Sequence, residues 1–160
     1  MAAQINRESL SKPTLFRGLQ DEELSQVAKL CSARSYKVGE ICQEDGKSEN
    51  RVHFIIKGMA GIVIRFPNVP HGSSEIIIEN LVVGDSFGWS TLIGRVPWST
   101  LKVLEEMDII FIETEDLLKL CEDHKNIGYI VMKNLASLIA TKFRHNRMSI
   151  LNAIVALKGA

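Results

Sequence analysis

The residues best suited to chemistry lie in the run 84–100, GDSFGWSTLIGRVPWST. A glycine at position 88 would let the backbone turn closely before a short helical piece over about residues 88–93. Free amides at the start of a helix bind anions, and hydroxyl and guanidinium groups strengthen such a site. The donors available here would be the amides of Trp89, Ser90 and Thr91, the hydroxyls of Ser90, Ser99 and Thr100, and the guanidinium of Arg95.

Two tryptophans, Trp89 and Trp98, flank this candidate anion site. Their rings are suited to stacking on a base or to lining an apolar pocket. The alternative is that they are core residues that fill or reshape the pocket, and Arg95 has the alternative of a solvated loop position. Both alternatives stay open, and the candidate binding residues are Phe87, Gly88, Trp89, Ser90, Thr91, Arg95, Trp98, Ser99 and Thr100.

Other motifs indicate neither catalysis nor metal binding. The G-x-S-x-G pattern at 84–88 matches a hydrolase nucleophile elbow, but that elbow requires a parallel α/β sheet for which the chain is too short. Cys121 and His124 lie three residues apart, yet zinc requires four ligands and no second pair follows. We interpret His53 as a structural residue and the basic run 142–147 as a solvated helix face. We therefore expect no enzyme activity and no metal.

The elements that must position the 84–100 segment are mainly short strands. Helical spacing predicts a helix within residues 14–34, and Gly-rich turns between short apolar runs predict a β-roll over about 36–114. Within the roll, we expect a hairpin that turns at Gly58 and a second turn at 105–107. The predicted strands are 51–57, 60–66, 75–83, 101–104 and 108–113, after a turn and short strand at 38–41.

The remainder of the chain, about 115–157, is expected to be helical. Thr114 is a plausible N-cap for a short helix over 115–122, and a much longer helix begins near residue 125. A helix of that length would outrun so small a domain, and a second copy of itself is the simplest partner for its far end. We therefore expect a homodimer through this helix, with an unidentified protein as a further partner.

The composition is that of one ordinary globular domain, residues 1–160. The charges balance, with 19 basic and 19 acidic residues, which argues against non-specific binding to nucleic acid or an anionic membrane. Three sparse cysteines make a poor disulfide framework and are expected to be small buried residues. The polar start MAAQINRESLSK is not a secretory signal, and no apolar run is long enough for a membrane span, so we expect a cytoplasmic protein.

Several spaced motifs resemble those of the cyclic-nucleotide-binding domain family, which includes catabolite activators and protein kinase regulatory subunits. They cover most of the chain: LFRGL at 15–19, VGEI at 38–41, EDG at 44–46, FIIKG at 54–58 and GDSFG at 84–88. The resemblance implies an α+β, mainly β fold, a double-stranded β-helix or jelly-roll-like β-roll with an N-terminal helix and C-terminal helices. It also implies that 84–100 is a variant of the family's phosphate-binding cassette.

The cassette departs from the family pattern at two positions. The family usually has a Glu after Phe-Gly that holds the ribose 2′-hydroxyl, and here Trp89 stands there. The family also usually has an Arg that pairs with the cyclic phosphate and stands directly before two small residues. Here Trp98 stands before Ser99 and Thr100. Loss of such a charge-assisted contact costs about 1.5–3 kcal/mol, or roughly tenfold to hundredfold in affinity.

The resemblance implies a regulatory, ligand-sensing module. Its ligand would be a cyclic nucleotide (cAMP or cGMP) or another small anion, bound weakly or atypically. A ligand-free interaction and dimerisation module is the first alternative, and a fragment or relative of a transcription regulator is the second. In the family's activators a helix-turn-helix domain comes after the long helix. Only residues 152–160 remain here for such a domain, which is too few, so we expect no binding to nucleic acid.

Overall fold

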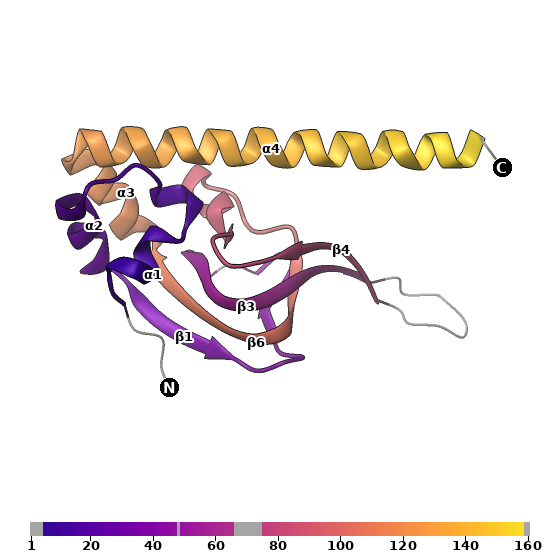
Figure 1. Ribbon diagram of the computed structural model, residues 1–160, viewed down its shortest axis with the longest axis horizontal. Helices are drawn as coiled ribbons and strands as arrows, with labels where there is room; N and C mark the ends of the chain where they lie inside the picture. Colours follow the sequence, from indigo (N-terminus) through magenta and orange to yellow (C-terminus); the bar gives the residue numbers. More distant parts are fainter. Residues whose placement is uncertain (1–4, 48, 66–74, 159–160) are drawn as a thin grey trace.

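The computed structural model describes residues 5–47, 49–65 and 75–158. Helices come first and last, and the strands lie between them (Figure 1). The N-terminal helices are α1 (Arg7–Ser11), the 3₁₀ helix η1 (Thr14–Phe16) and α2 (Asp21–Ala28). The middle elements are β1 (Ser32–Tyr36), β2 (Ile41–Gln43), β3 (Arg51–Arg65), β4 (Glu75–Leu81), β5 (Ser86–Phe87), the 3₁₀ helix η2 (Trp89–Ile93) and β6 (Thr100–Glu113). The C-terminal helices are α3 (Thr114–Asp123) and α4 (Lys125–Lys158).

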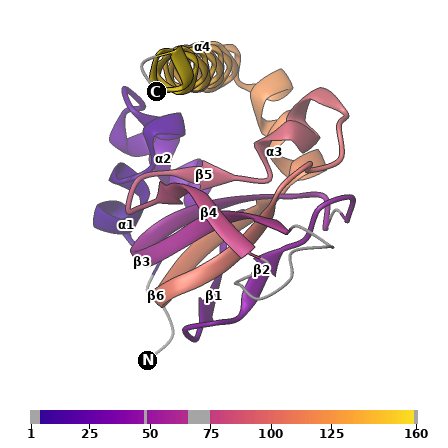
Figure 2. The same cartoon turned by 90° about the vertical axis from the view of Figure 1, so that its right-hand side faces the viewer.

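The strands pair antiparallel throughout the described part of the sheet. Its main order is β1-β6-β3-β4, while β2 also pairs with β6 and β5 with β3. Helix α4, viewed end-on in Figure 2, lies on the same side of the strands as α2 and α3. The prediction of a mainly β roll with flanking helices is therefore confirmed.

The predicted hairpin at Gly58 is wrong, and so is the predicted turn at residues 105–107. Both segments lie inside single long strands, β3 and β6, where Met59 pairs with Glu105 and the register shifts repeatedly. Gly58 has a φ of 80°, and a Cβ there would lie 2.1 Å from the Glu106 carbonyl oxygen. The two predicted turns are therefore one bend in two paired strands, because an irregular register kinks a strand without ending it.

The helix predicted within residues 14–34 ends earlier in the structure than we expected. Helix α2 stops at Ala28, and Ser32–Tyr36 form strand β1 against β6. The short run SARSY has little apolar periodicity of its own, so its strand structure depends on pairing with Met107–Phe111. By contrast, the helices predicted over 115–122 and from about 125 onward are confirmed by α3 and α4.

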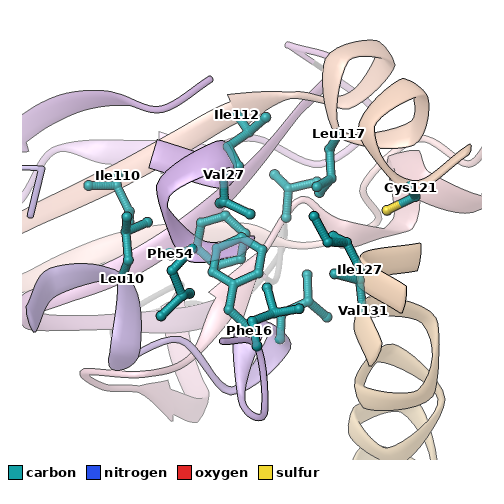
Figure 3. Close-up of a cluster of buried hydrophobic side chains, with 14 of the residues drawn as sticks. Leu10, Phe16, Val27, Phe54, Ile110, Ile112, Leu117, Cys121, Ile127 and Val131 are labelled. Carbon is teal, nitrogen blue, oxygen red and sulfur yellow. The ribbon is translucent and has the colours of Figure 1, made fainter. Parts of the chain in front are cut away.

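Two clusters of buried apolar side chains form the core. One lies inside the roll and includes Ile55, Leu101 and Ile109. The other joins the roll to the helices, where Val27, Phe54 and Ile112 meet Leu117 and Val131 (Figure 3). The second cluster anchors the start of α4 on the same framework that carries the cassette.

Helix α4 changes surroundings along its length. Asn134 donates hydrogen bonds to the carbonyls of Leu15 (3.0 Å) and Arg17 (2.9 Å), which fixes the first half of the helix on η1. At 1.5 Å per residue the helix is about 50 Å long, and its second half runs out beyond the N-terminal helices and past the roll (Figure 1). None of the helices in the described segments is both long and apolar enough to span a membrane.

Candidate ligand-binding site

The cassette begins where β5 pairs with β3. Ser86 is opposite Phe54 and Phe87 is opposite His53 in this pairing. Gly88 follows with a φ of 72°, and a Cβ at this position would lie 2.5 Å from the Arg51 carbonyl oxygen. Only glycine satisfies both the left-handed backbone and this close approach. The predicted tight turn at position 88 is therefore present, and η2 starts directly after it.

Thr91 holds the cassette together. Its amide donates to the Gly88 carbonyl at 3.1 Å, and its buried hydroxyl donates to the same carbonyl at 2.8 Å. That hydroxyl also lies 2.6 Å from the hydroxyl of Thr114. Thr114, predicted as a helix N-cap, is instead the first residue of α3, after Glu113 as N-cap. Of the three predicted free amides, those of Trp89 and Ser90 have no backbone partner among the described residues, whereas that of Thr91 does.

A cavity of about 670 Å³ opens between the cassette, the roll and α4. Its volume lies within the range of small-molecule sites, roughly 300–1,000 Å³. The cassette and the start of β6 contribute Ser86, Phe87, Gly88, Trp89, Ser90, Pro97, Trp98, Ser99, Thr100 and Leu101. The cavity therefore brings together every predicted site residue except Thr91 and Arg95.

The two tryptophans line this cavity without filling it. Their ring centroids are 6.4 Å apart and the planes are perpendicular. Trp89 is half-buried and packs against the core at the helical end, while Trp98 is 65% exposed. Edge-to-face aromatic pairs of this kind are stabilising and leave ring faces available to a ligand.

Both cations that line the cavity in the described part of the chain, Arg65 and Lys142, are already paired with carboxylates. Arg65 Nε lies 3.0 Å from a carboxylate oxygen of Glu75, and Lys142 on α4 pairs with Glu79 on β4. Hydrogen bonds from Lys102 and Arg65 lower the pKa of Glu75, so this carboxylate stays ionised. Arg95 is exposed and does not line the cavity, although its amide donates to the Ser90 carbonyl. The structure thus places Arg95 in a solvated loop.

Two residues of this cavity carry buried polar atoms that have no hydrogen-bond partner among the described residues. The Ser86 hydroxyl is one, on a residue only 2% exposed, and the Gln43 Oε1 is the other. Gln43 Nε2 donates to the carbonyl and hydroxyl oxygens of Ser99, at 2.9 and 3.1 Å. A carbonyl only accepts, so this contact fixes the amide orientation and leaves Oε1 as the free acceptor.

A second, smaller cavity of about 280 Å³ adjoins the first through Gln43, Gly88 and Pro97. His53 lines it and stacks on Phe87 with ring centroids 4.5 Å apart. Burial, with help from nearby Arg51 and Arg34, lowers the pKa of His53 to about 3, so the imidazole is neutral. Burial also raises the pKa of the Cys42 thiol to about 12. Both groups are therefore uncharged near neutral pH. The described residues contain no group of three or more potential metal ligands.

Sequence reasoning missed many of the residues that line this cavity, and four of them show why. Gln43 and Ser86 lie in short strands whose pairing was not predicted, and Ile139 and Phe143 come from α4. Lys142 belongs to the basic run predicted to be solvated, but it pairs with Glu79, 63 positions away in the chain. The length of the predicted helix was an available signal, but from it we expected a homodimer partner for the far end and no contact with the cavity.

The sequence matches the family model for the cyclic nucleotide-binding domain over residues 33–124, more than half of the chain. The chain belongs to this family. A comparison with curated protein sequences gave no match. The fold of this cyclic nucleotide-binding domain is shared by many solved structures at low sequence identity.

Three of these structures illustrate the range of structural similarity and sequence identity. A cyclic nucleotide-binding domain from Methylobacillus flagellatus KT has a TM-score of 0.75 at 19% identity, covering 90% of this chain and 79% of its own. The Thermus thermophilus catabolite activator protein has a TM-score of 0.69 at 22% identity, over 86% of this chain and 61% of its own. The regulatory domain of Toxoplasma gondii PKA, solved with cAMP, has a TM-score of 0.65 at 18% identity, over 84% of this chain and 48% of its own.

Proposed function

We propose that this cyclic nucleotide-binding domain is a regulatory module that takes up a small molecule in the 670 Å³ cavity and passes the signal through α4. The observation that carries the proposal is the composition of the cavity wall. Cassette residues such as Trp98 and helix residues such as Phe143 line the same space. A ligand there would contact both elements at once.

Contact with two elements is what a ligand needs to change their arrangement. The Lys142–Glu79 ion pair ties α4 to β4 beside the cavity. A ligand that binds more tightly when α4 is in one position shifts the population toward that position, by as much as its difference in affinity. Beyond the roll, α4 is free to carry this change to a partner. cAMP and cGMP are the first ligands to test, because the family is named for them.

Hydrogen exchange with and without ligand tests this proposal. We expect a bound ligand to slow exchange in the cassette, residues 87–100, and in α4 over residues 139–146. Residues 125–135 serve as an internal control, because their buried side chains already pack in the core. If cyclic nucleotides and a panel of small apolar compounds change neither exchange nor thermal stability, the module binds no ligand of these classes and the proposal fails.

The distal half of α4 supports a homodimer as the assembled form. Exposed apolar residues recur there at helical spacing, namely Phe143, Met148, Ile150, Leu151, Ile154 and Val155. A stripe with this spacing is typical of a helix that packs against another helix. A second copy supplies a matching stripe through two-fold symmetry. Sedimentation of the protein as a monomer at micromolar concentration would contradict the dimer.

The same stripe favours a second candidate function, a module that dimerises and binds no ligand. The hydrogen-exchange experiment separates the two functions. A dimer whose cassette and residues 139–146 respond to no compound would favour the second function over the first.

A further inference from the structure

The side chains that line the large cavity are mostly apolar. Trp89, Trp98 and Phe143 supply aromatic rings, and Ile62, Ile139 and Leu101 supply aliphatic groups. Several of these side chains are exposed in the absence of a ligand, Trp98 and Phe143 most of all, at 65% and 71%. Covering such groups with another apolar surface is favourable, at roughly 25 cal/mol per Å².

The cavity offers no spare positive charge to a phosphate. Its charged lining residues in the described part of the chain are Asp45, Arg65, Glu79 and Lys142. Both cations already have carboxylate partners, in the Arg65–Glu75 and Lys142–Glu79 pairs. An anion that entered would either compete with a glutamate for its partner or exchange its hydration for neutral donors alone, such as the hydroxyls of Ser90 and Ser99. Either event opposes binding of a charged group.

Two polar atoms of the large cavity have no partner in the described part of the chain, and they indicate the hydrogen bonds that a ligand there should make. Gln43 Oε1 is an acceptor only, because its amide nitrogen is held by Ser99. Ser86 Oγ, nearly fully buried, is free to donate or accept. A carboxylate or phosphate oxygen cannot donate to Gln43, whereas an N–H or O–H group can. The free acceptor therefore calls for a donor group on the ligand, while the paired cations disfavour a charged one.

We propose that the cavity selects an uncharged, largely apolar molecule that carries an N–H or O–H donor, rather than a cyclic nucleotide. This inference rests on the proposed function, since it names the ligand class of the same site. The aromatic and aliphatic walls bind the body of the molecule, and Gln43 and Ser86 orient its polar group.

N-phenyl-1-naphthylamine is a suitable probe, because it is uncharged, has one N–H donor and fluoresces in apolar surroundings. We expect saturable binding that millimolar cAMP or cGMP does not reverse. Trp98→Arg removes an aromatic wall and adds a cation at the cavity, so we expect the affinity for the probe to fall about tenfold or more. Tyr129→Ala is the matched control, since Tyr129 is an equally exposed aromatic residue on α4 that does not line the cavity.

The outcomes separate the two proposals. If cAMP or cGMP displaces the probe or raises the melting temperature, the ligand class proposed here is overturned and the sensing function stands. If neither the probe nor the nucleotides bind, both proposals fall. If the probe binds equally well to the Trp98→Arg variant, it occupies another surface, such as the distal stripe of α4, and the inference is overturned.

Discussion

The two halves of α4 belong to one continuous helix but have opposite surroundings. In the first half, Ile127, Val131 and Leu135 are buried in the cluster that joins the roll to the helices. In the second half, Leu151, Ile154 and Val155 are as apolar but exposed. The first half is therefore held by the fold, while the second half is available to a partner. A helix with this division is suited to carry a change from the cavity, which lies between the two halves, to another molecule.

The largest effect should come from a charge in the first half. Val131→Asp places a carboxylate at a fully buried position without a partner, and we expect a loss of about 4 kcal/mol or more in the free energy of unfolding. Urea denaturation followed by circular dichroism measures it. Val155→Asp makes the same change at a position 69% exposed in the monomer and should change the free energy of unfolding of the monomer by less than about 0.5 kcal/mol. Equal losses in the two variants would contradict the division of the helix.

A smaller loss is expected from Gly128→Ala, near the start of α4. A Cβ at this position would lie 2.5 Å from the Cys121 carbonyl oxygen, so α3 and α4 would have to move apart. Alanine in place of glycine favours a helix by about 1 kcal/mol, yet we expect a net loss of roughly 1–3 kcal/mol from the overpacking. Thermal unfolding measures whether the variant is less or more stable than the original protein. A stabilised variant would show that the two helices do not approach so closely, and Ser137→Ala, on an exposed part of α4, controls for propensity.

Lys142→Met, at the boundary between the two halves of α4, should have a modest effect on the local stability of the helix. It removes the ion pair with Glu79 but keeps the length of the side chain, and partly exposed ion pairs contribute at most about 1 kcal/mol. We expect faster hydrogen exchange over residues 139–146 with little change in overall stability. Arg144→Met is the control, because no ion pair of Arg144 is found in the described part of the chain. Equal exchange in both variants would mean that the pair does not hold α4 on β4.

The smallest effect on the stability of the roll is expected from Leu151→Asp. Its side chain is 45% exposed and lies beyond the core, so unfolding of the monomer should change by less than about 0.5 kcal/mol. The same substitution introduces a charge into the proposed helix pair and should convert the dimer into monomers. Light scattering after gel filtration measures the mass. A variant that remains a dimer would place the interface elsewhere.

Much of the fold could be predicted because its signals are local. The acidic start of α2, the glycine at position 88 and the long periodic run of α4 each report on their own neighbourhood in the chain. The bend at Gly58 was misread as a hairpin because a glycine between two apolar runs has the same local pattern in either case. Only the pairing of β3 with β6 along their whole lengths distinguishes a bend from a turn.

The candidate site was predictable in part for a similar reason. Residues 87–100 are contiguous, so the cassette was visible in the sequence, and the structure brings most of its predicted residues to one cavity. Gln43 and Phe143 were missed because they reach that cavity from β2 and α4, far from the cassette in the chain. Their contribution depends on how distant segments pack, which no local pattern reports.

The sequence by itself determined the family and the order of the elements. It also determined that Trp98 stands where the family's cassette usually has an arginine. All three depend on residue types and spacings along the chain. Tertiary structure decided whether the cations at the cavity are free to bind a ligand. Lys142 and Arg65 are ordinary cations in the sequence, and they lose their availability only because folding places Glu79 and Glu75 beside them. The ligand class proposed here follows from that pairing, because electrostatic partners are chosen by distance in space rather than by distance in sequence.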